Sequence, residues 1–334
     1  MHALVFLTVA GTFLLFLVGS RWTVLPFFGF LVTVGVGWSR YQAEAAKALS
    51  FLTTVATVLI LSLIIAFLLL RSIPILEHMG LELLTRTAQP LWTSSQGGVY
   101  TLTPMMAGTA LTTIIATAIA APLGIAGAVF VSEIAPDTVR EVIKPGIELM
   151  AGIPSITYGF IGLTIVNQYL YVEFRTPTIG NYFAAGIMIG IMALPTVVTV
   201  AEDALSAVPE SIKSGAQALG STEWQTTKSV TIPAALSGIS AGVLLGVGRA
   251  MGETMAATVM LSHTKGFPNP FVDVFSNYGE TLTTVIAFEG GNASGIHMSA
   301  LFAGGVVLFV MVMLLSVTSQ WIEWRMHERL GGER

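Results

Sequence analysis

The feature that most constrains this chain is the segment 51–70, in which no side chain is charged. About 20 apolar residues in a helix cross the roughly 30 Å hydrocarbon core of a bilayer. Hydrophobic residues make up 54% of the 334 residues and charged residues 10%, against about 25% charged residues in an ordinary soluble domain. This composition argues against a soluble globular enzyme and excludes a disordered chain. It predicts a multi-span membrane protein.

Several other segments are apolar over lengths that suit a membrane-spanning helix. We predict eight spans, at residues 3–19, 24–38, 51–70, 105–132, 147–166, 183–200, 234–262 and 299–322. The first two are expected to form a hydrophobic hairpin within an N-terminal region, 1–48, and the rest of the spans belong to a larger region, 49–334. No Lys or Arg precedes the first apolar run, so we read it as a retained helix rather than a signal peptide.

The placement of Lys and Arg predicts the orientation, because cytoplasmic loops carry an excess of these residues. An even number of spans puts both termini on one side, together with Arg40, Lys47, Arg140, Lys144, Lys213, Lys228, Arg325, Arg329 and Arg334. The other side carries only Arg21, Arg71, Arg86, Arg175 and Lys265. Both termini are therefore predicted to be cytoplasmic, and the long polar loops 71–104 and 263–298 are predicted to face the outside.

The cytoplasmic loop 201–233 has the pattern of two helices separated by a glycine. Gly220 suits the left-handed conformation that ends a helix. Thr222 and Gln225 then have the spacing of a capping box at the start of a second helix. One interpretation is a plain amphipathic connector between spans. The other is a docking element for a soluble partner, because an ordered elbow with an aromatic residue, Trp224, near its tip resembles an interface anchor.

The predicted span 234–262 contains two charges, Arg249 and Glu253. A charge near the bilayer centre costs at least about 2.5–3.5 kcal/mol, so it usually pairs or faces a polar cavity. The four-residue spacing puts both on one helical face. They are either a structural ion pair or a gate, in which Arg249 meets an anion in transit and Glu253 holds or releases the arginine. Glycines at four-residue spacing permit close helix packing beside them: Gly238, Gly242 and Gly246.

The predicted span 147–166 contains Pro154, which removes an amide donor and is expected to kink the helix. The kink frees carbonyl groups that need protein or water partners. Ser155 and Tyr158 would then line a path through the membrane. The alternative is an ordinary kinked helix whose role is packing.

The stretch Ser214–Gly220, followed after nine residues by Val230–Pro233, resembles the EAA loop of binding-protein-dependent ABC importer permeases. The Gly and Pro are in register with that pattern, whereas Ser214 and Gly215 replace its first Glu and Ala. The resemblance implies that the loop carries a coupling helix that docks into a groove of an ATPase subunit. The coupling residues it implies are Ala216, Gly220, Ser221, Thr222, Glu223 and Trp224.

Three further stretches, 151–159, 193–196 and 248–254, resemble the phosphate-specific members of this permease family. The continuation Glu253–Ala256 is closer to PstC-like than to PstA-like permeases. The resemblance implies an all-α integral membrane protein, with a type I ABC importer core of six transmembrane helices beside the N-terminal hairpin. The substrate-pathway residues we expect are Arg249, Glu253, Thr254, Pro154, Ser155 and Tyr158.

The resemblance also implies partners. They are a PstA-like permease subunit, a dimer of PstB-like ATPase subunits and a PstS-like phosphate-binding protein outside the membrane of a prokaryote. Membrane lipid surrounds the chain. Nucleic acid is not expected as a partner, because the net charge is −4 and no basic block is present.

Several chemistries are absent from the sequence. It has no Gly-x-x-x-x-Gly-Lys-Ser/Thr loop, so the chain is not expected to bind ATP itself. It has no cysteine, and its histidines lack metal-ligand spacing and are expected to be solvated. We therefore predict no catalytic residue, cofactor or metal. The alternatives are a permease for sulfate or molybdate, a stand-alone secondary anion transporter, and a membrane-embedded enzyme using Glu148, Glu202 and Asp203.

Overall fold

The computed structural model describes residues 2–329 except 94–97, 269 and 277, and every regular element in those residues is a helix. By its contacts the chain divides into two compact units, Met1–Leu68 and Leu69–Arg334. The division falls inside one long helix, α3 (Gln42–Met79). This division reflects which residues contact one another and does not separate regions by function. The predicted boundary at 48–49 between the hairpin and the transport region therefore stays a prediction.

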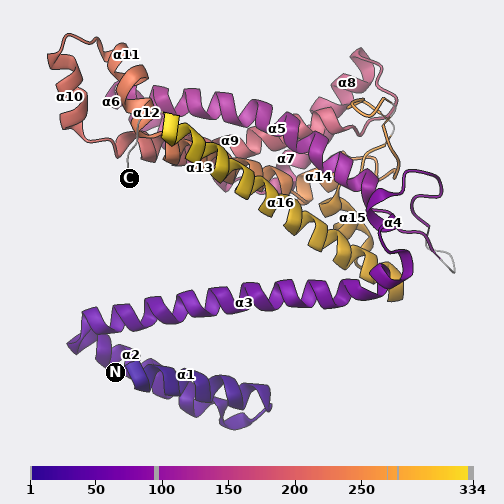
Figure 1. Ribbon diagram of the computed structural model, residues 1–334, viewed down its shortest axis with the longest axis horizontal. Helices are drawn as coiled ribbons and strands as arrows, with labels where there is room; N and C mark the ends of the chain where they lie inside the picture. The colour runs from indigo at the N-terminus through magenta and orange to yellow at the C-terminus, as the bar shows by residue number, and fades with distance from the viewer. Residues whose placement is uncertain (1, 94–97, 269, 277, 330–334) are drawn as a thin grey trace. The chain divides into compact units, whose positions relative to one another are not determined.

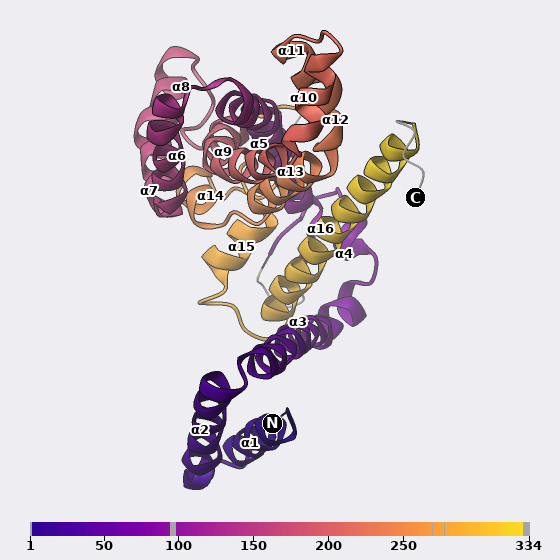
Figure 2. The same cartoon turned by 90° about the vertical axis from the view of Figure 1, so that its left-hand side faces the viewer.

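The first unit contains the expected N-terminal hairpin. Helices α1 (His2–Leu17) and α2 (Val24–Arg40) are joined by the short turn η1 (Arg21–Thr23). They pack closely because glycines lie at the contact, with Gly11 facing Pro26 and Gly29 facing Thr8. The first part of α3 completes this unit (Figures 1 and 2).

The second unit continues from α3 through a series of helices and helical turns. They are α4 (Glu82–Thr85), α5 (Thr103–Val129), η2 (Phe130–Ile134), α6 (Asp137–Gly152), α7 (Ser155–Ile161), η3 (Gly162–Asn167), α8 (Gln168–Glu173), α9 (Tyr182–Ser206), α10 (Glu210–Ala218), α11 (Glu223–Thr226), η4 (Thr227–Thr231), α12 (Ile232–Ala234), α13 (Leu236–Met251), α14 (Met255–Met260), α15 (Leu282–Glu289) and α16 (Gly295–Arg329). In this unit the α10–α11 hairpin and α15 lie at opposite ends (Figure 1).

Helix α9 is the centre of the second unit, and it packs most extensively on α5 and α13. Small residues permit these contacts. A Cβ atom added at Gly124 of α5 would lie 2.6 Å from Val197 Cγ1, and one at Gly246 of α13 would lie 2.5 Å from Val197 Cγ2. The predicted glycine stripe of span 234–262 therefore faces α9, as expected for helices that pack closely in lipid.

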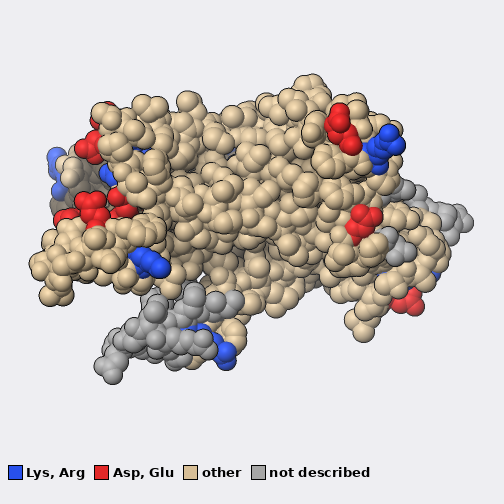
Figure 3. All heavy atoms as spheres, turned by 90° about the horizontal axis from the view of Figure 1, so that it is seen from above, with Lys and Arg blue, Asp and Glu red and all other residues tan. Residues whose placement is uncertain are grey.

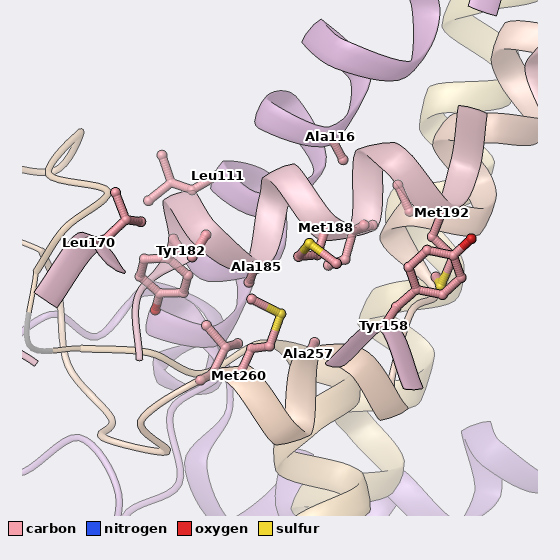
Figure 4. Close-up of a cluster of buried hydrophobic side chains, with 14 residues drawn as sticks. Leu111, Ala116, Tyr158, Leu170, Tyr182, Ala185, Met188, Met192, Ala257 and Met260 are labelled. Carbon is pink, nitrogen blue, oxygen red and sulfur yellow. The ribbon is translucent and has the colours of Figure 1, made fainter. Parts of the chain in front are cut away.

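A buried apolar cluster holds the short helices α7 and α14 against α9 (Figure 4). Met188 of α9 lies close to Met260 of α14, and Met192 lies beside Tyr158 of α7 (Figure 4). Methionine is unbranched and flexible, so it fills the irregular gaps that bent helices leave. The cluster therefore packs against the two short helices, α7 and α14, that begin where membrane segments are interrupted.

Five helices in the described residues are long and apolar enough to cross a membrane: Arg21–Arg40, Gln42–Met79, Thr103–Ile134, Tyr182–Ser206 and Gly295–Trp321. Two bent pairs bring the number to seven, and Ala3–Leu17 is a shorter apolar helix. On the face seen in Figure 3, charged side chains gather at the two ends and the surface between them is uncharged. The fold is that of an all-α, multi-pass membrane protein.

Two of the predicted spans are not single helices. The first is bent by 90° between Asp137–Gly152 and Ser155–Glu173, at the position where Pro154 was expected to act. In the second, the prediction of one helix across 234–262 is wrong. Its helix α13 ends at Met251, and a separate helix α14 begins at Met255.

Candidate functional site

The predicted elbow of loop 201–233 is confirmed in its local geometry. Helix α10 ends before Gly220, which has a φ of +92°, a conformation that glycine adopts without steric cost. The capping box is formed in both directions. The Thr222 backbone N–H donates to Gln225 Oε1 at 2.9 Å, and the Gln225 backbone N–H donates to Thr222 Oγ1 at 3.3 Å. Residues close together in the sequence, Gly220, Thr222 and Gln225, therefore fix the conformation of this turn.

The tip of the elbow exposes apolar side chains. Leu219 is 91% exposed and Trp224 is 56% exposed. Gly220, Thr222 and Glu223 are exposed as well, whereas two further predicted coupling residues, Ala216 and Ser221, are half-buried. An ordered surface with an exposed Trp and Leu suits a protein partner, since aromatic anchors dominate interface energies.

Arg249 lies in the last turn of α13 and is half-buried. Its Nη1 donates to Thr196 Oγ1 of α9 at 3.1 Å. Arginine has five N–H donors, and this hydrogen bond uses one of them. Among the described residues no other hydrogen bond or ion pair of this guanidinium is present. The guanidinium therefore keeps N–H donors that no described residue occupies.

The predicted pairing of Arg249 with Glu253 is not formed. Glu253 Oε1 accepts a hydrogen bond from the Ala256 backbone N–H at 2.9 Å, and no ion pair joins it to Arg249 among the described residues. The reason is the break after Met251, because four-residue spacing puts two side chains on one face only within a continuous helix. The third predicted residue, Thr254, lies in the break and its hydroxyl donates to Gly252 O at 3.2 Å.

The bend at Pro154 is bridged by a hydrogen bond from Tyr158, one of the predicted pathway residues. The Tyr158 hydroxyl donates to Met150 O at 3.0 Å, so it satisfies a carbonyl near the helix break. Its ring is buried in the apolar cluster around α9. Ser155 is half-buried at the start of α7. A pathway role for these residues stays a prediction.

A second polar site was missed by sequence reasoning. We call it the loop cluster: His263, Lys265, Glu280, Glu289 and His297. Lys265 Nζ lies 3.7 Å from Glu280 Oε2 and also pairs with Glu289. His263 Nδ1 lies 3.2 Å from Glu280 Oε1, and His297 Nε2 lies 2.7 Å from Glu289 Oε2. Both histidines therefore have carboxylate partners, and the expectation that they are solvated is wrong.

The electrostatics of the loop cluster follow from burial and pairing. Burial alone would raise the pKa of Glu289, but hydrogen bonds from Lys265 and His297 outweigh it and hold the pKa below its ordinary value. The hydrogen bond to Glu280 raises the pKa of His263 above its ordinary value, against the opposing effect of burial. The charged partners are spaced up to 34 positions apart within residues 263–297, and Trp92 Nε1 from a distant segment donates to Glu289 Oε2 at 2.9 Å. A local motif therefore gave no signal for this site.

Comparisons with known proteins place these features in context. Residues 120–328 match the family described as "Binding-protein-dependent transport system inner membrane component". The chain is 38% identical over 229 residues to the "Probable ABC transporter permease protein YqgH" of Bacillus subtilis, covering 68% of this chain and 72% of that protein. It is 33% identical over 260 residues to the "Phosphate transport system permease protein PstC" of Haemophilus influenzae, covering 72% and 81%.

The similarity extends to a third relative and to a solved structure. The "Probable phosphate transport system permease protein PstC" of Methanocaldococcus jannaschii is 31% identical over 285 residues, covering 79% of this chain and 89% of that protein. A bacterial alginate ABC transporter in complex with its pentasaccharide-bound periplasmic protein superposes with a TM-score of 0.56 at 16% identity, covering 86% and 97%. That structure supports the fold.

Proposed function

The chain belongs to the family of binding-protein-dependent transport system inner membrane components, and we propose that it is the PstC-type subunit of an ATP-driven importer for inorganic phosphate. It is a transport subunit rather than an enzyme. The observation that carries this proposal is the exposed, locally ordered elbow 209–233 in a chain whose relatives are phosphate transport permeases. A channel or a secondary transporter has no need of such a surface.

Permeases of ABC importers work with ATPase subunits and a substrate-binding protein. In this chain the partners would be a PstA-like permease, a PstB-like ATPase dimer and a PstS-like phosphate-binding protein. Both termini would face the cytoplasm of a prokaryotic cell, which puts the elbow on the side where ATP is available. The binding protein would dock on the opposite side, on loops 71–104 and 263–298.

The proposed mechanism is alternating access. Closure of the ATPase dimer on ATP moves the elbow, which ends within α12 and is followed directly by α13. Helix α13 carries Arg249, whose remaining N–H donors match the oxygens of phosphate. Because Glu253 does not pair with this arginine, an incoming anion has no carboxylate to displace. The breaks after Met251 and at Pro154 precede two helices that pack on each other, α14 and α7, and they give both membrane segments a place to bend.

The substrate assignment is tested by uptake of labelled phosphate into vesicles that contain the complete complex. We expect Arg249→Ala to reduce uptake at least tenfold at equal membrane abundance, and Arg249→Lys to restore part of it, because the charge remains but the planar fork is lost. Thr164→Val is the control, since Thr164 is exposed and its hydroxyl donates to its own helix, to Phe160 O at 2.8 Å.

Competition by unlabelled anions separates the alternatives. An excess of phosphate should suppress the labelled uptake, whereas sulfate and molybdate at the same concentration should leave it unchanged. Stronger competition by sulfate or molybdate would assign the chain to another oxyanion importer. Undiminished uptake by Arg249→Ala would remove Arg249 from the pathway.

A further inference from the structure

The two halves of the elbow are attached to the rest of the second unit in different ways. The second half is attached by packing, since Thr227 and Thr231 are buried and Ile232 contacts an apolar cluster that includes Ala128, Leu205 and Ile239. The first half, α10, has no buried residue, and its close neighbours are η4 and α11 of the elbow itself. Apolar packing therefore does not hold α10 to the membrane helices.

Among the described residues, one ion pair makes that connection instead. Lys213 Nζ of α10 lies 2.8 Å from Glu133 Oε1 in η2, the segment that continues α5. The two side chains are only 16% and 7% exposed. A pair this well shielded is weakly screened by solvent and has a defined geometry, in contrast to a surface pair. It resists both separation and sliding of α10 against α5.

The contact continues across the unit as a series of polar contacts, in which the Ser132 and Ser206 hydroxyls touch while each donates its one hydrogen to a carboxylate. Ser132 Oγ donates to the same Glu133 oxygen at 2.8 Å and lies 3.4 Å from Ser206 Oγ of α9. Ser206 Oγ donates to Glu202 Oε1 at 2.9 Å. Lys144 Nζ of α6 lies 2.9 Å from that Glu202 oxygen. The series thus joins α10 to α5, α9 and α6.

The backbone at the centre of this series is fixed as well. Arg140 of α6 donates from Nε to Val131 O at 2.8 Å and from Nη2 to Ser132 O at 2.6 Å. These carbonyls belong to η2, so the Arg140 side chain binds α6 directly to the main chain of η2. Movement of Glu133 is therefore passed to α6 rather than absorbed by a flexible loop.

We propose that the Lys213–Glu133 ion pair is the joint that transmits movement of the elbow to α5, and that Ser132, Ser206, Glu202 and Lys144 distribute it to α9 and α6. This inference rests on the proposed function, because it assigns the means by which the elbow acts on the membrane helices. Lys213 and Glu133 are positioning residues, since they touch neither the substrate nor ATP. Loss of the joint uncouples ATP hydrolysis from transport without preventing assembly.

The test measures phosphate imported per ATP hydrolysed, in vesicles that contain the complete complex with its ATPase and binding protein. Lys213→Glu and Glu133→Lys should each lower this ratio at least tenfold, while the complex still copurifies and hydrolyses ATP. The double exchange, Lys213→Glu with Glu133→Lys, should restore at least half of the ratio. Glu141→Lys on α6 is the control for a charge reversal, because Glu141 is exposed and has no ion pair among the described residues.

The outcomes separate this inference from the function on which it rests. Wild-type vesicles that show no ATP-dependent phosphate uptake contradict the proposed function, whatever the variants do. Wild-type transport together with unchanged ratios in both single variants contradicts the joint alone. A double exchange that stays as uncoupled as the single variants also contradicts it, because a specific pair must tolerate reversal of both charges.

Discussion

The elbow and the region around α15, which lie at opposite ends of the second unit (Figure 1), differ in how they hold their polar groups. At the elbow, neighbours in the sequence order the turn through Gly220 and the capping box, and the charged and aromatic side chains at the tip face outward. In the loop cluster, charges spaced along residues 263–297 converge, and Glu280 is 1% exposed. The elbow is built to present a surface, and the loop cluster is built to hold several segments together.

The comparison predicts that a backbone change has its largest effect at the elbow. Gly220→Pro forces a φ near −65° where the chain needs +92°, so the turn cannot form. We expect loss of ATPase copurification and of phosphate uptake, with normal membrane insertion. Gly220→Asn is the matched control, because asparagine tolerates the left-handed region and no atom lies within 4 Å of an added Cβ. Normal assembly of Gly220→Pro would mean that the turn is not the docking element.

A charge deletion should instead have its largest effect in the loop cluster. Lys265→Met keeps the volume but removes the cation that Glu280 and Glu289 share, and breaking a buried ion pair costs on the order of 3–5 kcal/mol. We expect a lower temperature of thermal unfolding in detergent. On the elbow, Lys228 is exposed and has no ion pair among the described residues, so Lys228→Met should change the temperature little. Equal effects at the two positions would remove the contrast between the two ends.

The smallest expected effect is a pH dependence confined to the loop cluster. The lowered pKa of Glu289 stabilises the fold above the ordinary value of 4.5, and this contribution is lost as pH falls through the lowered pKa. The raised pKa of His263 stabilises the fold fully below the ordinary value of 6.5, and this contribution is lost as pH rises through the raised pKa. Both contributions are therefore fully present between pH 4.5 and pH 6.5.

Hydrogen exchange measured at several pH values checks this window. Intrinsic exchange rates are corrected for pH, and protection of segment 263–297 is compared with protection of the elbow, which contains no histidine. Lys265, Glu280 and His297 face the two titrating groups and share the same segment. We expect protection of the segment to be highest between 4.5 and 6.5. A maximum outside this range would show that other groups govern the cluster.

Local signals explain what the sequence predicted correctly. The uncharged segment 51–70 lies within helix α3, and the bend at Pro154 follows from the amide that proline lacks. The elbow also follows from adjacent residues. In these cases the residues that fix the structure lie within a few positions of one another, so periodicity, caps and breakers were sufficient.

The features that were missed depend on contacts between distant residues. The break after Met251 contains no proline. Two hydrogen bonds stabilise it. Glu253 Oε1 accepts from the Ala256 backbone N–H in the first turn of α14, and Thr283 Oγ1 of α15 donates to Glu253 O at 2.7 Å. A single sequence gives no signal for such a contact, and the pairing of Arg249 with Glu253 was mispredicted for this reason. The loop cluster was missed in the same way.

The central claim is that ATP hydrolysis, acting through the elbow, drives phosphate import. The direct measurement is accumulation of labelled phosphate in vesicles that contain the complete complex, with ATP or with a non-hydrolysable analogue at the ATPase. The account predicts accumulation against a gradient with ATP and none with the analogue. Equal accumulation without hydrolysis would contradict it and would indicate a transporter that works without an ATPase.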